Sequence, residues 1–238
     1  MTAATKGTLT KSRKNNLRKA LLICGILASL IYVTTDLIAG TLYPGYSFTS
    51  QAVSELFAIG APTSGLVVPL FTVSSLLLLA FTFGVWKSSA VANTGRSRAP
   101  RIMALMIIGN AVISLILWNF FPMHMRGAEM TFTDTMHVIL AINPFVPLMV
   151  ILGIVAFRNW FRFYSIGTIL MIVVLSVLGF MYVSQFVAQQ ATPWVGLYER
   201  ISQYGTMLWV AVLAIVLLRA ETARSAIMLK GSSQQSAS

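Results

Sequence analysis

Six apolar stretches, each about as long as a bilayer is thick, constrain this chain more than any other feature of its sequence. An α-helix rises ~1.5 Å per residue, so ~20 residues cross a hydrocarbon core of ~30 Å. Asp36 is the one formally charged residue inside these stretches. The sequence therefore predicts an all-α, polytopic membrane protein, a bundle of six transmembrane helices. The stretches are Leu21–Gly40, Leu66–Trp86, Ile102–Phe121, Val138–Phe157, Phe163–Val183 and Ile201–Leu218.

The composition excludes an ordinary water-soluble domain. Hydrophobic residues make up 57% of the 238-residue chain and charged residues 10%, whereas a soluble protein carries roughly 25% charged residues. Fifteen of the 17 Lys and Arg residues fall on one side of the membrane if the chain crosses it six times, and only Arg126 and Arg200 fall on the other. Because short basic loops stay in the cytoplasm, we expect both termini to be cytoplasmic and the protein to lie in the cell membrane.

The net charge of +11 is thus an orientation signal that also attracts anionic lipid headgroups. Nucleic acid is not an expected partner, because no pattern of stacking aromatic residues accompanies the charges. We expect a loose basic cytoplasmic tail over residues 1–19, a transmembrane domain over residues 20–220 and a flexible cytoplasmic tail over residues 221–238. Residues 87–100 read as a cytoplasmic linker. The single cysteine, Cys24, excludes an internal disulfide.

The loops on the outer side are richer in chemistry. They comprise residues 41–64, 122–136 and 188–200. The first of them contains a predicted short amphipathic helix that lies on or dips into the outer surface. Its polar side would carry Gln51, Ser54, Glu55 and Ala58, and its apolar side Val53, Leu56 and Phe57.

Acidic residues and histidines concentrate at this outer end. Five of the six acidic residues and both histidines map there, and only Glu221 is cytoplasmic. Because the three outer loops meet at one face, we predict that these groups line one polar, ionisable pocket. The candidate residues are Asp36, Ser54, Glu55, His124, Arg126, Asp134, His137, Asn143, Glu199 and Arg200.

Simpler roles compete with the pocket at several positions. Asp134 and Glu199 stand where an acid complements the dipole at the start of a helix. Asp36 lies about a turn inside the first span, so it needs a partner, with Arg126, Arg200 or a histidine as candidates. Asn143 precedes Pro144, which frees a backbone carbonyl and would make the amide a polar floor below His137.

Zinc is an alternative that the residue types leave open. His124 and His137, with Asp36, Asp134 or Glu55, would supply the three protein ligands of a catalytic zinc site. Their spacing matches no zinc signature, so we predict no cofactor and favour a pH-sensitive hydrogen-bonded cluster.

Four strings at the outer end carry a resemblance to a known family. TSQAVSELFAIGAPTS, FPMHMRG, TDTMHVILA and GLYERI resemble a bacterial and archaeal family of six-span membrane proteins, domain-of-unknown-function family 998. The resemblance covers about residues 20–220. It implies the six-span fold and no activity, and its strings contain Ser54, Glu55, His124, His137, Glu199 and Arg200.

Three functions remain open at this point. The first is non-covalent binding of a small polar molecule or lipid headgroup in the outer pocket, with membrane lipids as partners. The second is a metal-dependent intramembrane hydrolase acting on a lipid or an amide. The chain resembles more distantly the alkaline ceramidase and progestin-receptor type, but it has two histidines where those proteins use three, and six spans where they have seven. The third is a small proton-coupled transporter, which would also need polar residues through the inner half of the bundle.

Overall fold

The computed structural model describes residues 3–88, 98–182, 184–185, 188 and 190–235, and these residues form helices and connecting loops without a strand. Six helical segments among them are long and apolar enough to cross a membrane, as predicted. The elements are α1 (Ala3–Leu42), the 3-10 helix η1 (Val53–Phe57), α2 (Ser64–Lys87), α4 (Arg98–Phe120), α5 (Phe132–Ala141), α6 (Phe145–Ala156), α7 (Trp160–Phe180) and α9 (Val195–Gln235).

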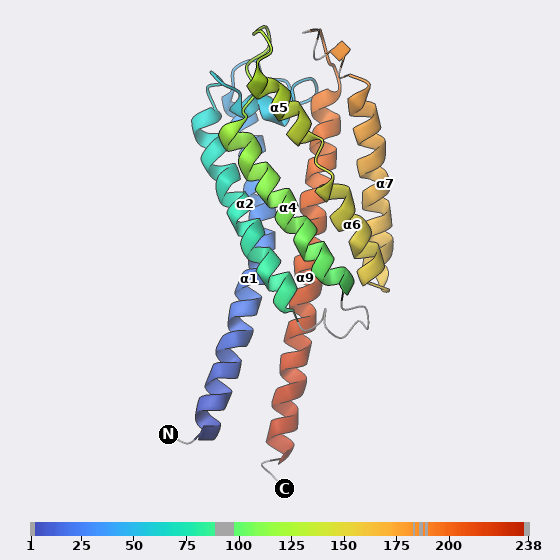
Figure 1. The fold of residues 1–238 in the computed structure, drawn as a ribbon. Coiled ribbons are helices and arrows are strands. Elements are labelled where there is room, and N and C mark those ends of the chain that lie inside the picture. Colours follow the sequence, from blue (N-terminus) through green and yellow to red (C-terminus); the bar gives the residue numbers. More distant parts are fainter. Residues whose placement is uncertain (1–2, 89–97, 183, 186–187, 189, 236–238) are drawn as a thin grey trace.

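The spanning helices form a ring in chain order. Each packs against the next, from α1 through α2, α4, α6 and α7 to α9, and α9 closes the ring against α1 (Figure 1). Their outward faces carry large exposed apolar side chains such as Leu30, Phe83 and Leu105. A continuous apolar outer surface suits contact with lipid chains. We call the end formed by residues 43–63, 121–131, 181–182 and 190–194 the loop end, and the opposite end the terminal end.

The half of the ring nearer the terminal end is packed solid. Phe81, Met103, Phe161 and Trp209 are fully buried in one apolar cluster that joins all the spans. The indole of Trp209 donates to the Ser165 hydroxyl at 2.9 Å, so its one polar atom is satisfied inside this core. This half of the bundle is therefore closed.

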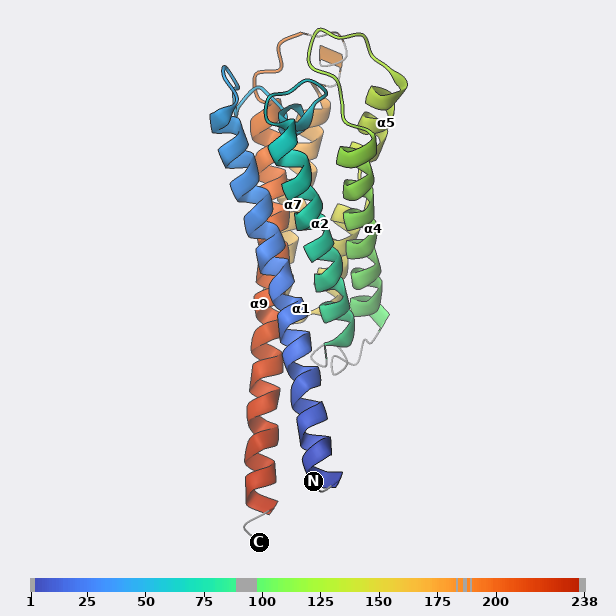
Figure 2. The same ribbon diagram turned by 90° about the vertical axis from the view of Figure 1, so that its left-hand side faces the viewer.

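Both described chain ends are helical. α1 begins at Ala3 and α9 continues to Gln235, and the two helices run side by side beyond the other spans (Figure 2). Polar contacts join them, because Arg18 pairs with the buried Glu221 at 3.5 Å and Asn15 donates to Ser225 at 2.7 Å. Most of the predicted linker, residues 89–97, lies outside the described residues.

The short helix predicted in the first outer loop is present as η1, and it is more deeply buried than a helix lying on the surface would be. η1 is a five-residue 3-10 helix, and Val53, Leu56 and Phe57 are buried with Glu55. Its apolar residues pack into a second core cluster with Phe71 of α2, while the Glu55 carboxylate is covered by its partner Arg126. Both sides of the segment are thus occupied, so it plugs the loop end of the ring.

Candidate functional site

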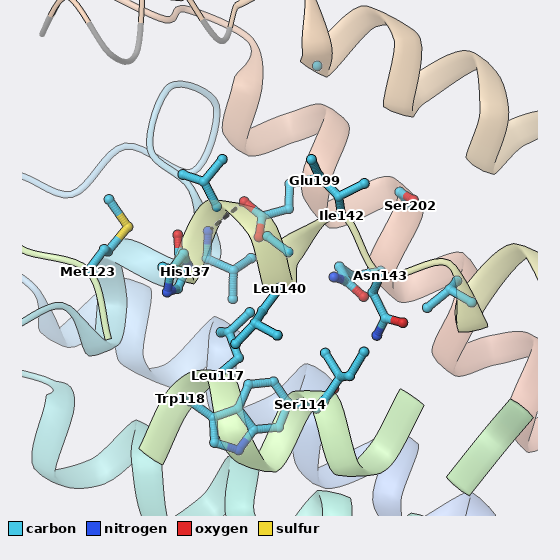
Figure 3. Close-up of a pocket in the computed structure, with 18 of the residues that line it drawn as sticks. Ser114, Leu117, Trp118, Met123, His137, Leu140, Ile142, Asn143, Glu199 and Ser202 are labelled. Atoms are coloured by element: carbon cyan, nitrogen blue, oxygen red, sulfur yellow. Dashed lines mark hydrogen bonds between the residues drawn. The ribbon is translucent and has the colours of Figure 1, made fainter. Parts of the chain in front are cut away.

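A cavity of about 710 Å³ occupies the loop-end half of the bundle, above the packed core. All six spans and η1 contribute to its wall, which is mostly apolar, with Phe71, Trp118 and Ile172 among the lining residues. Polar side chains also line it at several levels, among them those of Ser74 and Ser114, and Figure 3 shows His137, Asn143 and Glu199 around it. A mostly apolar chamber with placed polar groups is the usual form of a small-molecule site.

The cavity opens sideways, at the level of the membrane. Ile142, Val173, Val177 and Phe180 line it, and yet their side chains are 67%, 50%, 58% and 68% exposed. These residues therefore mark a mouth between α7 and the junction of α5 with α6. The mouth exists because α5 packs against α4, whereas no comparable packing joins it to α7.

The wall beside this mouth is a broken helix. The fourth span, predicted as one helix over Val138–Phe157, ends as α5 at Ala141 and starts again as α6 at Phe145. Proline lacks the N–H that would continue the helix and disfavours helical backbone at the residue before it, so the break falls at Asn143 and Pro144. Broken helices at membrane depth are tolerated where they line a cavity, as here.

The side-chain amide of Asn143 satisfies one backbone N–H group at the break and links the break to α4. Its Oδ1 accepts from the Phe145 N–H at 3.1 Å, and its Nδ2 donates to Oδ1 of Asn110 in α4 at 2.8 Å. Both asparagines line the cavity. Asn110 of α4 and Asn143, between α5 and α6, therefore form a pair of linked amides on the cavity wall.

Glu199 and His137 supply polar groups nearer the loop end. The Glu199 carboxylate accepts from the Val53 N–H at 3.0 Å, which fixes η1 over the start of α9. His137 contacts the Phe121 carbonyl oxygen through Nδ1 at 2.7 Å. A carbonyl can only accept, so Nδ1 carries the proton and Nε2 is the nitrogen left for another partner.

His124 and Asp134 form the rim. Oδ1 of Asp134 accepts from the His124 N–H at 2.7 Å, and its Oδ2 lies 2.9 Å from His124 Nδ1. Oδ2 also accepts from the Thr131 N–H at 2.9 Å and from its hydroxyl at 2.7 Å. Asp134 therefore caps α5, as its simpler role predicts, and ties the preceding loop to that helix.

Two ion pairs lie at this end. Asp36 is fully buried, and Arg200 binds both of its oxygens at 2.9 and 3.0 Å. The Glu55 carboxylate accepts hydrogen bonds from Arg126 Nε at 2.9 Å and from Arg126 Nη2 at 2.8 Å. Arg126 and Ser54 line the cavity, but Asp36, Glu55 and Arg200 do not. The expected single pocket is thus divided into a cavity and a supporting ion-pair layer.

Sequence reasoning missed the tyrosines that complete this layer. Tyr204 donates to Asp36, and Tyr46 accepts from Arg200 while its hydroxyl donates to the Ala52 carbonyl at 2.7 Å. Burial raises the pKa of Tyr46, in the loop after α1, well above its ordinary value, so the phenol stays protonated and keeps that donor. Tyr204 stands four residues after Arg200, a helical spacing that could have revealed the pair.

A match to a protein family covers most of the chain. The model of a family described as a protein of unknown function, DUF998, matches residues 26–216. The chain belongs to the DUF998 family. The DUF998 match starts within α1 and ends within α9, so it includes every span, the cavity and all ten candidate residues. No curated protein and no solved structure matches the chain. Any function must therefore be argued from the site itself.

The donor set of this DUF998 site is arranged for hydrogen bonding. Asp36 is paired with Arg200, His124 with Asp134, and His137 with a backbone carbonyl. Within the described part of the chain, no three His, Cys, Asp or Glu side chains gather as the zinc alternative requires.

Proposed function

We propose that this DUF998 protein binds one amphiphilic, lipid-like molecule in the cavity without covalent chemistry. The observation that carries the proposal is an apolar chamber with a mouth flanked by lipid-exposed Ile142, Val177 and Phe180. A molecule could enter from the bilayer without crossing water. Its chain would lie against residues such as Trp118 and Ile172. Its polar end would meet the groups of Glu199, His137 and Asn143.

Transport is the second candidate, and the broken fourth span favours it. Discontinuous helices form substrate sites near the membrane midplane in many carriers. The packed core around Phe81, Phe161 and Trp209 closes the terminal half in this conformation, so a carrier would need a second state. Binding requires no such rearrangement, and we place it first.

We further propose that the protein lies in the cell membrane with both termini in the cytoplasm, which puts the cavity on the outer side. The fifteen-to-two division of Lys and Arg residues supports this orientation. With Cys24 replaced by serine, cysteines at the exposed positions Ala128 and Gln190 should react with an impermeant thiol reagent on intact cells. A cysteine at the exposed Thr222 should react only after lysis. The reverse pattern would overturn the orientation.

Filling the cavity tests the proposed function directly. Ser202 of α9 lines the cavity (Figure 3). The substitution Ser202→Phe places a ring in the space where the ligand would lie. We expect wild-type protein, purified in mild detergent, to retain about one lipid or amphiphile per chain in native mass spectrometry. The Ser202→Phe variant should lose most of that occupancy.

Leu208→Phe is the matched control, because it adds a ring to the same helix at a side chain that is 56% exposed. It should keep wild-type occupancy. Equal loss in both variants, or a wild-type protein that retains nothing above the background of a membrane protein without such a cavity, would contradict binding.

A further inference from the structure

Charge pairing distinguishes Glu199 from the other acids that are at least partly buried at the loop end. Asp36 is matched by Arg200, Glu55 by Arg126 and Asp134 by His124. Among the described residues Glu199 joins no ion pair, although its side chain lines the cavity. Carboxylates away from water are normally paired. The cavity therefore holds an acid whose partner is not supplied by the described part of the chain.

The geometry leaves one oxygen of Glu199 for a ligand. Oε2 accepts from the Val53 N–H at 3.0 Å, and Oε1 has no hydrogen-bond partner among the described residues. Only Trp118 Nε1 and Gln185 Oε1 are both completely covered and unpartnered in that part of the chain. The free oxygen of Glu199 is thus uncovered, and the space beside it is the cavity, in which Figure 3 shows this side chain.

The cationic groups on the cavity wall do not offset this acid. Arg126 donates to Glu55 at 2.9 and 2.8 Å and to the Ser50 carbonyl at 2.9 Å, so its charge is held by another carboxylate. His124 is held by Asp134, and His137 donates from Nδ1 to a carbonyl. Glu129, exposed on the lining, adds a second negative charge. The wall therefore carries more negative charge than positive charge that is not already held by another partner. In a chamber of low dielectric such an excess attracts a positively charged group.

Two aromatic rings lie on the same cavity wall as the acid. Tyr182 and Tyr198 both line the cavity, with ring centroids 6.4 Å apart, and Tyr198 precedes Glu199 on α9. The faces of aromatic rings attract cations, and quaternary ammonium groups are bound in this way.

We infer that the ligand is a cationic amphiphile whose positively charged nitrogen pairs with Glu199, while its chain fills the apolar part of the cavity. The inference rests on the proposed function and names the class of molecule that the site selects. A free alkylammonium and the amine headgroup of a phospholipid share this chemistry. An anionic amphiphile would meet a carboxylate with no free cation beside it.

The test uses full-length protein in a neutral maltoside detergent and probes with matched chains. Titration calorimetry compares dodecyltrimethylammonium, laurate and dodecanol. Glu199→Gln should weaken binding of dodecyltrimethylammonium by about tenfold or more, because a partly buried charge partner is lost. Binding of dodecanol should change by less than about twofold. Binding of dodecyl lysophosphatidylethanolamine would be measured in the same way. Whichever of this lysophospholipid and dodecyltrimethylammonium binds more tightly identifies the source of the positively charged group.

Two variants control for folding and for general charge. Glu199→Asp keeps the carboxylate and should retain most of the affinity for the cation. Thr222→Lys changes the net charge by the same amount at an exposed position of the terminal end and should cost less than about threefold, since solvent screens it. An unchanged cation affinity in Glu199→Gln, or tighter binding of laurate than of the cation by the wild type, would overturn the inference.

The result also separates this inference from the proposal on which it rests. If Ser202→Phe blocks dodecanol but Glu199 substitutions do not affect the cation, the cavity binds amphiphiles and only the charge selection is wrong. If no probe responds to Ser202→Phe, the proposed function itself fails.

Discussion

Replacing Arg200 with methionine should destabilise this protein more than any other single change at the loop end. Methionine keeps the length of the side chain but leaves Asp36, which is fully buried, without its cation. Breaking a buried ion pair from one side costs about 3–5 kcal/mol. The Phe48 and Gln51 carbonyls, both bound by Arg200 at 2.9 Å, also lose their donor. We expect a Tm reduced by ~6 °C or more in detergent.

Arg126→Met is the matched control, because that arginine side chain is 29% exposed whereas Arg200 is 6% exposed. Its loss should be clearly smaller. The double variant Asp36→Leu with Arg200→Met should recover much of the stability, since an apolar replacement of a buried pair is often neutral. A Tm for Arg200→Met equal to that of Arg126→Met would show that the Asp36 pair is not the main tie at this end.

The substitution Gly196→Ala should also destabilise the loop end, by steric conflict with the backbone. A Cβ at Gly196 would collide with the Gln51 carbonyl oxygen and would lie 2.7 Å from that of Phe48. Arg200 holds both carbonyls, so the loop cannot easily yield. Overpacking of this kind costs about 1–3 kcal/mol, which a thermal melt would register as a fall of ~2–12 °C.

Gly167→Ala is the control, and for it we expect no loss of stability. Gly167 lies within α7, and a Cβ there would meet no heavy atom within 4 Å. Alanine in an unobstructed helical position is more favourable than glycine by about 1 kcal/mol. Gly167→Ala should therefore leave the Tm unchanged or raise it. If both alanine variants behaved alike, the close approach of α9 to the 48–51 loop would be wrong.

The spans could be predicted from sequence because each is an apolar run of membrane length, and hydropathy acts locally. The break in the fourth span is a different matter. Pro144 sits inside a run that is apolar apart from Asn143, so hydropathy indicates one helix. The proline signals a possible interruption, but the contact of the preceding Asn143 with Asn110 depends on how α4 packs.

The pairing of the loop-end charges lay beyond sequence reasoning for a similar reason. The acids and bases could be assigned to one end, but Asp36 and Arg200 are 164 residues apart. The candidates Arg126, Arg200 and histidine were equivalent until the ring brought α1 against α9. Asp134 and His137 both line the cavity. The partner of Asp134 is His124, which the loop after α4 folds back onto the first turn of α5.

Locating a bound chain within the protein tests the central claim most directly. A dodecyl alcohol carrying a diazirine would be irradiated with the protein in membranes, and the labelled residues mapped by mass spectrometry. Label should concentrate on Ser114 and Trp118, which line the cavity, rather than on Leu105 and Val112, which are exposed on the outer face of the same helix. Ser202→Phe should abolish the inward label and spare the outward one. Label confined to Leu105 and Val112, and indifferent to Ser202→Phe, would contradict an amphiphile-binding cavity.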